Sequence, residues 1–354
     1  MRVGILTFQF AINYGAMLQA YALKRYLGQH EVDAELVPYY PEKFRIQYST
    51  SPIAGGLTIK KRIKNLCFYP YRTKQIHKFY SFKGQYLYGD NVNESPNFAS
   101  LAKRYDCMFF GSDQIWNTGI SYDDPAYFGA GTSVSKIAYA ASFGTSSLND
   151  SQRQFVKKYL PDFSSVSVRE SNSKLLLHEN GIESEVVCDP VFLLSAQEWR
   201  GMEEPVRKIH KKYVLLYMLS NDDKLLAEAK EYAQAHSCDI YAIHPTLELK
   251  QSGVEMLTDV GPKEFLWLID HAECVATNSF HAVSFGVIFK RHLLHIPSKK
   301  SPGRTVSLLN SLNAPCDSKQ IYDVDIAKLN FSAFSSLVDR SKKYIEKSLD
   351  LYTV

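Results

Sequence analysis

The sequence predicts an α/β protein built from two Rossmann-like domains, each with a parallel sheet covered by helices on both faces. Two observations support this fold class. The chain has 354 residues, well above the length of about 150 residues that is usual for one domain. Short apolar runs alternate with segments of helical periodicity in both halves of the chain. Alternation of strands and helices in both halves is typical of parallel sheets that are covered on both faces.

The first half, residues 1–200, begins with a strand–helix–strand pattern at Arg2–Phe8, Ala16–Leu27 and Asp33–Val37. Residues 41–100 are broken up by Gly and Pro, which predicts a basic, aromatic insertion of one or two helices and loops. The alternation then resumes. We predict strands at Asp106–Gly111, Lys136–Ser142, Ser164–Arg169 and Glu185–Cys188, and helices at Ser151–Tyr159 and Ser171–Asn180.

The second half, residues 201–354, follows a polar connection and starts with the apolar run Tyr213–Leu219. Pro262 stands where a helix tolerates proline, in its first turn. The last helix is a candidate to pack back on the first domain. We predict further strands at Asp239–Ile243, Cys274–Ala276 and His292–His295, and helices at Asp222–His236, Pro262–Asp270, Phe280–Phe289, Thr305–Leu312 and within Ile326–Leu351.

Several classes of protein are disfavoured by composition. The start MRVGILTFQF enters a strand directly and does not resemble a secretory signal, and no run of about 18 apolar residues suggests a transmembrane helix. The six Cys residues are scattered without a CxxC pair, which favours buried thiols in a reducing cytoplasm. No His/Cys cluster has metal-ligand spacing, so no metal is predicted.

The positive charge is concentrated in one segment. Residues 43–89 carry ten Lys or Arg and no Asp or Glu, in a chain whose net charge is +4. About ten Phe and Tyr are interleaved with them. Such a segment suits an anionic membrane, a phosphate-bearing lipid or nucleic acid, or it forms a solvated basic flank. Since the rest of the chain is not basic, we expect no nucleic-acid partner.

Two polar turns follow strands in the first half, where ligands bind in open α/β sheets. Asn13, Tyr14 and Gly15 form the first and are candidate acceptor-binding residues. The second holds Asp113, which could act as a general base or could cap a turn. Gln114 and Trp116 accompany it as acceptor-binding candidates; the indole could stack on a sugar ring or pack in the core.

A third turn contains Arg169, between a strand and a helix. A guanidinium there suits a carboxylate or a phosphate, or it forms an ion pair with Glu170.

In the second half, the segment Thr277–Ala282 runs from a strand into a helix start, where backbone N–H groups favour an anion. His281 lies in the first turn and Ser279 just before it. The basic loop that follows contains Lys300 and Arg304, which could complete an anion pocket or remain solvated.

Six blocks in this order and spacing resemble polysaccharide pyruvyl transferases: MRVGILTF…INYGAMLQAYAL, FFGSDQIWN, YAASFG, SVRE, CDPVFLL and TNSFHAVSFGVIF. The resemblance spans residues 1–312 and implies a glycosyltransferase-B-like architecture with a cleft between the domains. It also implies transfer of pyruvate from phosphoenolpyruvate to two sugar hydroxyls. Donor binding would involve Arg169, Ser279, His281, Lys300 and Arg304, with His281 as the acid and Asp113 as the base. The family often has an arginine where this chain has Ser279, so Lys300 or Arg304 would supply that charge.

The resemblance further implies a cytoplasmic enzyme of bacterial capsule or exopolysaccharide synthesis, with phosphoenolpyruvate as co-substrate and no cofactor. Its acceptor would be an oligosaccharide on polyprenyl diphosphate, met at the inner membrane face through residues 43–89. A homo-oligomer is compatible with it. Two other readings stay open: a nucleotide-sugar-dependent glycosyltransferase of the same architecture, and an inactive sugar-binding homologue.

Overall fold

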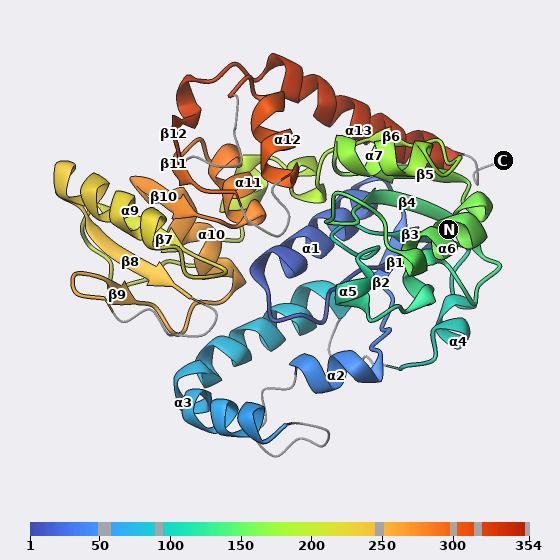
Figure 1. The fold of residues 1–354 in the computed structure, drawn as a ribbon, viewed down its shortest axis with the longest axis horizontal. Coiled ribbons are helices and arrows are strands. Elements are labelled where there is room, and N and C mark those ends of the chain that lie inside the picture. The colour runs from blue at the N-terminus through green and yellow to red at the C-terminus, as the bar shows by residue number, and fades with distance from the viewer. Residues whose placement is uncertain (49–57, 89–94, 245–250, 298–302, 315–320, 351–354) are drawn as a thin grey trace. The chain divides into compact units, whose positions relative to one another are not determined.

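The computed structural model describes residues 1–48, 58–88, 95–244, 251–297, 303–314 and 321–350. The chain divides into two compact units, each built around one six-stranded sheet (Figure 1). Unit 1 comprises Met1–Ser49, Lys83–Leu194 and Ser332–Val354, and unit 2 comprises Thr50–Phe82 and Ser195–Phe331.

The sheet of unit 1 has the strand order β2-β1-β3-β4-β5-β6, and every pairing in it is parallel. All carboxyl ends therefore lie at one edge, where the polar turns after β1 and β3 also lie. The strands are β1 (Arg2–Leu6), β2 (Asp33–Leu36), β3 (Cys107–Phe110), β4 (Ser135–Ala141), β5 (Ser165–Val168) and β6 (Glu185–Val186).

The helices of unit 1 cover both faces of this sheet. On one face, Phe110 and Val168 join a core cluster with Val156 of α6 and Leu177 of α7. On the other, Tyr139 packs against Tyr344 of α13. The helices are α1 (Tyr14–Gln29), α2 (Glu42–Tyr48), α4 (Phe98–Ala102), α5 (Thr118–Ser121), α6 (Asp150–Tyr159), α7 (Ser171–His178) and α13 (Ser332–Asp350), with a π-helical turn at Lys83–Tyr88 and 3-10 turns at Pro125–Phe128, Leu160–Asp162 and Pro190–Leu193.

The sheet of unit 2 has the strand order β12-β11-β10-β7-β8-β9 and is parallel except for β12, which pairs antiparallel with β11. The residues of its central strands are buried on both faces, as their apolar sequences predict. The strands are β7 (Tyr213–Tyr217), β8 (Asp239–Ile243), β9 (Glu255–Met256), β10 (Cys274–Thr277), β11 (His292–His295) and β12 (Tyr322–Asp325).

Helix α9 (Asp223–Ala235) packs on one face of this sheet, with Leu225 and Ala229 in a cluster that includes Leu216. On the other face, Phe265 of α10 (Pro262–Asp270) contacts Tyr217, and α11 (Phe280–Ile288) approaches β11 closely at Gly286. Figure 1 shows these helices around the sheet. Unit 2 also contains α3 (Ile59–Phe82), α8 (Ala196–Arg200), α12 (Gly303–Ser311) and a 3-10 turn at Ile326–Lys328.

The predicted fold class is confirmed, since both sheets are predominantly parallel and helix-covered. The division of the chain is finer than the sequence suggests. It falls between Leu194 and Ser195, the predicted insertion contributes α2 to unit 1 and α3 to unit 2, and α13 belongs to unit 1. The strands β9 and β12 are additions at the sheet edges. In the described residues, no helix has the length and apolar character needed to cross a membrane.

Candidate functional site

The carboxyl edge of the unit 2 sheet is organised around the end of β10. Register places Thr277 beside Tyr217 of β7 and beside His295 of β11. The Thr277 hydroxyl donates to the Tyr217 carbonyl at 2.6 Å and accepts from the Ser279 backbone N–H at 3.0 Å. This threonine therefore holds the start of the following helix against the neighbouring strand.

Asn278 fixes the same turn from its other side. Its side-chain oxygen accepts from the Leu219 N–H at 2.8 Å, and its amide donates to the Ser220 carbonyl at 2.9 Å. The turn between β10 and α11 is thus tied to the end of β7 by hydrogen bonds in both directions, which positions the first turn of α11.

That first turn carries the predicted acid. Ser279 is the N-cap residue of α11 and makes no side-chain capping bond, and His281 lies two positions further on, 7% exposed. The Arg304 guanidinium of α12 lies 5.5 Å from the ring centroid of Phe280, the residue before His281. The structure therefore brings three of the predicted donor-site residues together at a helix N-terminus, where the peptide dipoles favour an anion.

His295 also lies at this edge, and the sequence analysis did not single it out. It is fully buried, and its Nδ1 lies 2.8 Å from the Thr277 carbonyl, so Nδ1 carries the proton. Burial lowers the pKa of His295 to about 4, although the bond to Thr277 raises it. The imidazole is therefore neutral near pH 7. Its position at the end of a predicted strand is the signal that could have identified it.

In unit 1, Asp113 follows β3 and is the most exposed acid of a buried ion-pair cluster. Its backbone adopts φ 71°, a left-handed conformation that Asp tolerates better than most residues. Its carboxylate lies 3.6 Å from the Arg169 guanidinium and is 16% exposed. This geometry leaves part of the Asp113 carboxylate accessible to a ligand hydroxyl while the carboxylate forms an ion pair with Arg169.

Arg169 is the centre of that cluster, and its side chain is only 2% exposed. It pairs with Asp189 at 2.6 Å and approaches Glu170 at 3.8 Å. Burial by itself lowers the pKa of Arg169, but the three carboxylates outweigh it and raise the pKa, so the guanidinium stays charged. The sequence analysis expects Arg169 to bind the donor directly. In the structure its guanidinium faces protein carboxylates, which does not favour such a contact. Arg169 is better described as orienting Asp113.

Asp189 was missed as a site residue, and Glu170 was considered only as a partner of Arg169. Glu170 accepts hydrogen bonds from the hydroxyls of Ser142 and Ser173, and Asp189 accepts from the Val191 N–H at 3.1 Å. With three acids around one arginine, this edge of unit 1 is negatively charged. It therefore suits neutral hydroxyls better than a phosphate.

The first polar turn has a structural function. Asn13 caps α1, and its side-chain oxygen accepts from the Ala16 N–H at 3.0 Å. Tyr14 and Gly15 are buried in the first turn of the same helix. Gln114 is 8% exposed and lies beneath Gly144, whose added Cβ would stand 2.2 Å from the Gln114 amide nitrogen.

Of the two roles that the sequence allows for Trp116, the structure shows the indole packed in the core. The indole is completely buried, and its Nε1 donates to the Tyr127 carbonyl at 3.1 Å. Its ring packs on Phe128 and Phe143. Because the ring is packed in the core, it has no exposed face on which a sugar ring could stack. Lys300, another predicted donor residue, lies outside the described residues.

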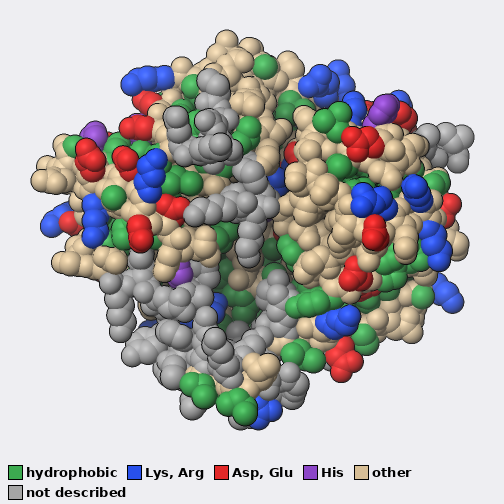
Figure 2. All heavy atoms as spheres, viewed as in Figure 1, with side chains coloured by type: hydrophobic (Ala, Val, Ile, Leu, Met, Phe, Trp, Pro, Cys, Tyr) green, Lys and Arg blue, Asp and Glu red, His purple; other side chains and the backbone are tan. Residues whose placement is uncertain are grey.

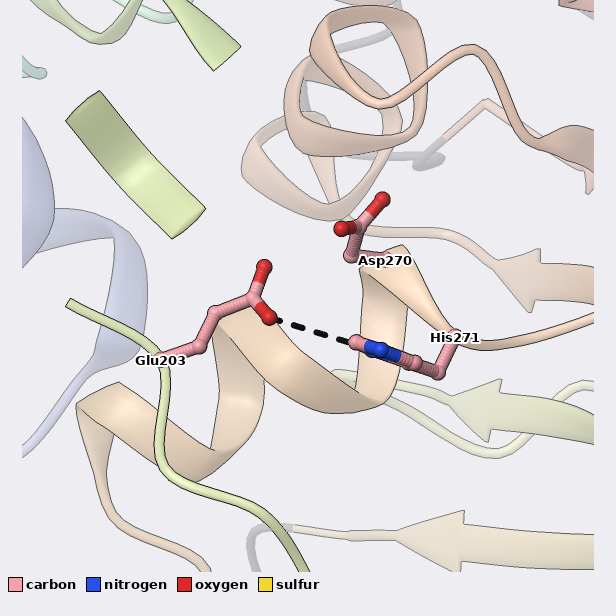
Figure 3. A group of neighbouring side chains, drawn as sticks. All are labelled: Glu203, Asp270 and His271. Atoms are coloured by element: carbon pink, nitrogen blue, oxygen red, sulfur yellow. Dashed lines mark ion pairs between the residues drawn. The ribbon is translucent and has the colours of Figure 1, made fainter. Parts of the chain in front are cut away.

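Glu203, Asp270 and His271 form a group whose candidate ligand atoms lie within 4.8 Å of one another (Figure 3). Arg200 donates to Asp270 at 2.7 and 3.0 Å, and Arg291 donates at 3.1 Å. Two guanidinium groups therefore already neutralise the central carboxylate. The group lies where α10 ends and the strands begin, away from the carboxyl edge, and is best described as an ion-pair cluster.

Comparison with known folds agrees with this architecture. The UDP-GlcNAc 2-epimerase from Neisseria meningitidis, a structure bound to UDP-GlcNAc, has a TM-score of 0.53 at 12% identity, covering 99% of each chain. The corresponding epimerase from Methanocaldococcus jannaschii has a TM-score of 0.52 at 13% identity, covering 99% of this chain and 100% of its own. At such identities the likeness shows the fold alone, a glycosyltransferase-B-like fold with two α/β units.

A comparison of the sequence with curated proteins gives no significant match. The family model for polysaccharide pyruvyl transferase matches residues 13–299, which include β3, the Arg169 cluster and the turn from β10 into α11. The match covers most of the chain and both units. The chain therefore belongs to the polysaccharide pyruvyl transferase family.

Proposed function

We propose that this protein transfers pyruvate from phosphoenolpyruvate to two hydroxyls of a sugar in a surface or capsular polysaccharide repeat unit, forming a cyclic ketal and releasing phosphate. The observation that supports it best is the placement of His281 in the first turn of α11, with Arg304 over the adjacent Phe280. A helix N-terminus, an imidazole and a guanidinium together suit a small, multiply charged donor.

The donor would bind at this edge of unit 2. Its phosphate would accept hydrogen bonds from the N–H groups of the first turn of α11, and Arg304 and Lys300 would supply the positive charge that Ser279 lacks. Such preorganised charge stabilises the negative charge on the departing phosphate.

Protonated His281 would give its proton to the methylene carbon of phosphoenolpyruvate, leaving a cationic centre at the adjacent carbon. A sugar hydroxyl attacks this centre and forms a C–O bond, with Asp113 as the acceptor of its proton. The C–O bond to phosphate then breaks. The second hydroxyl closes the ketal, and its proton restores His281. Asp113 releases the proton that it took from the first hydroxyl, and the departed phosphate gains one, through solvent. Phosphoenolpyruvate and diol thus yield ketal and phosphate without an oxidant, and the scheme requires no cofactor.

The acceptor side is assigned to unit 1, where the cluster around Asp113 is negatively charged. The acceptor would be a bacterial repeat-unit oligosaccharide on polyprenyl diphosphate, met at the cytoplasmic face of the membrane. The basic segment 43–89 supports such a location, because anionic lipids attract clustered Lys and Arg.

The test is release of phosphate from phosphoenolpyruvate in the presence of candidate acceptors, with the ketal detected by its mass. Replacing His281 with Ala should lower the rate by about a hundredfold or more, because a general acid typically contributes that much. His236→Ala, at an exposed histidine of the same unit, is the matched control and should leave the rate unchanged. Near wild-type turnover by His281→Ala would sink the mechanism. Binding of nucleotide sugars but not phosphoenolpyruvate in calorimetry would favour a glycosyltransferase instead.

A further inference from the structure

Helix α3 is anchored to unit 2 through its carboxyl-terminal half. Ile76, Phe79 and Phe82 are buried there. Lys78 forms an ion pair with Glu264 of α10, and its stem lies against Gly261, the residue before that helix. This half of α3 therefore has buried apolar side chains and contacts the start of α10 through Lys78.

The first turns of α3 have the opposite character. We call residues Ile59–Lys64 the α3 tip. Ile59 is 78% exposed and Ile63 is 58% exposed, and the intervening Arg62 is exposed as well. Ile59 and Ile63 are four residues apart and so lie on one face of the helix. Figure 2 shows apolar side chains beside a basic one where Figure 1 draws the first turns of α3.

Two isoleucines at such exposure are costly in water, and a helix that lies on a membrane surface uses this combination of exposed apolar residues and flanking cations. The tip sequence IKKRIK carries four Lys or Arg, and the whole of 43–89 contains no acid that would repel an anionic surface. Helices α6 and α9 differ from this tip in charge pattern, because they mix acidic and basic residues along their length.

We propose that the α3 tip docks on an anionic lipid surface, with Ile59 and Ile63 entering the headgroup region and the positive charge of the tip sequence attracting the lipid phosphates. Nucleic acid fits less well, since it would use the cations but gives no reason to expose two isoleucines. The inference deepens the proposed function by naming the surface through which a lipid-linked acceptor would be reached. The docking itself does not depend on catalysis.

The experiment is co-sedimentation of the full-length protein with vesicles of phosphatidylcholine, with and without phosphatidylglycerol. The wild type should sediment with the anionic vesicles and not with the neutral ones. The double variant Ile59→Gln/Ile63→Gln should bind the anionic vesicles about tenfold or more weakly, because two apolar side chains no longer enter the interface. The matched control is Leu175→Gln, which alters a similarly exposed apolar residue, 62% exposed, on α7 and should bind like the wild type.

The contribution of charge is tested with a quadruple variant of the tip: Lys60→Gln, Lys61→Gln, Arg62→Gln and Lys64→Gln. Its control removes the same charge from exposed sites elsewhere: Lys103→Gln, Lys157→Gln, Lys158→Gln and Lys174→Gln. Only the first should lose binding. Equal losses in both, unchanged binding by the isoleucine variant, or release of the wild type by duplex DNA with no effect of the isoleucine variant would each overturn the proposal. His281→Ala should bind vesicles like the wild type, so loss of catalysis and loss of docking are separate outcomes.

Discussion

At the scale of single residues, the aromatic and charged groups that look functional in the sequence have divided roles in the structure. Arg304 lies over Phe280, the residue next to His281 in the first turn of α11, whereas Arg169 is surrounded by carboxylates. A charged side chain that is 2% exposed needs such partners, because an unpaired buried guanidinium would be strongly destabilising. We therefore expect Arg169 to affect activity through Asp113.

Trp116 provides a prediction at this scale. Trp116→Ala should lower the free energy of unfolding by roughly 3–5 kcal/mol, because it leaves a cavity among buried aromatic rings. Trp116→Phe keeps most of the ring and should cost less. Denaturant unfolding measures both, and acceptor KM in Trp116→Phe is the discriminating readout. A large rise in KM with unchanged stability would restore the stacking role.

At the scale of elements, the cluster of Glu203, Asp270 and His271 joins the segment after α8 to the end of α10 (Figure 3). Arg200 and Arg291 connect α8 and the turn before β11 to Asp270. Burial tends to raise the pKa of Asp270, but the two arginines outweigh it and lower the pKa. Burial, followed by the charge of Asp270, raises the pKa of Glu203 from 4.5 to about 7.

This shift has a defined sign. A carboxyl whose pKa is raised by folding binds its proton more tightly in the folded state, so its stabilising contribution is present below pH 4.5 and is lost as the pH rises through about 7. Glu203→Gln keeps a neutral, hydrogen-bonding side chain. The melting temperature of Glu203→Gln relative to that of the wild type should therefore increase as the pH rises from about 5 to about 8.

Calorimetric melts across this pH range check the prediction. Glu204→Gln is the matched control, since Glu204 is the next residue and its side chain is 54% exposed in an ion pair with Lys263. Its difference from the wild type should stay flat with pH. A flat difference for Glu203→Gln as well would show that the buried carboxyl does not couple to folding in this way.

At the scale of the whole molecule, the chain leaves unit 1 and returns to it. Helix α13 follows unit 2 in sequence but packs in unit 1, where the Tyr344 hydroxyl donates to the Ala138 carbonyl at 3.0 Å. The Cys188 N–H donates to the Ser341 hydroxyl at 2.8 Å. These bonds link α13 to backbone groups of β4 and of the segment after β6.

Unit 1 should therefore depend on the end of the chain. Ile345 of α13 is fully buried. Ile345→Ala should lower the free energy of unfolding by about 2–5 kcal/mol, and the decrease should appear in the unfolding transition of unit 1. Lys347→Ala, at an exposed position of the same helix, controls for helix propensity. Scanning calorimetry with limited proteolysis distinguishes the units. Equal stability of the two variants would mean that α13 adds little to the unit.

The amino-acid sequence was sufficient to predict two α/β units, the polar turns after β1, β3 and β10, and the placement of His281 at a helix start. Each follows from local patterns, namely apolar runs of strand length, helical periodicity and polar residues at strand ends. The short edge strands escaped this reasoning. β9 has only two residues, and β12 has the sequence YDVD, so neither forms a continuous apolar run.

Contacts between residues that are distant in sequence could be seen only in the tertiary structure. In the structure, Arg169 is surrounded by Asp113, Glu170 and Asp189. Arg304 lies over Phe280, and Trp116, a candidate for stacking on a sugar, is part of the core. The structure also assigns α3 to unit 2 and α13 to unit 1. The physical reason is that burial and charge pairing depend on which elements pack together, and side chains that look alike in sequence acquire different roles through those contacts.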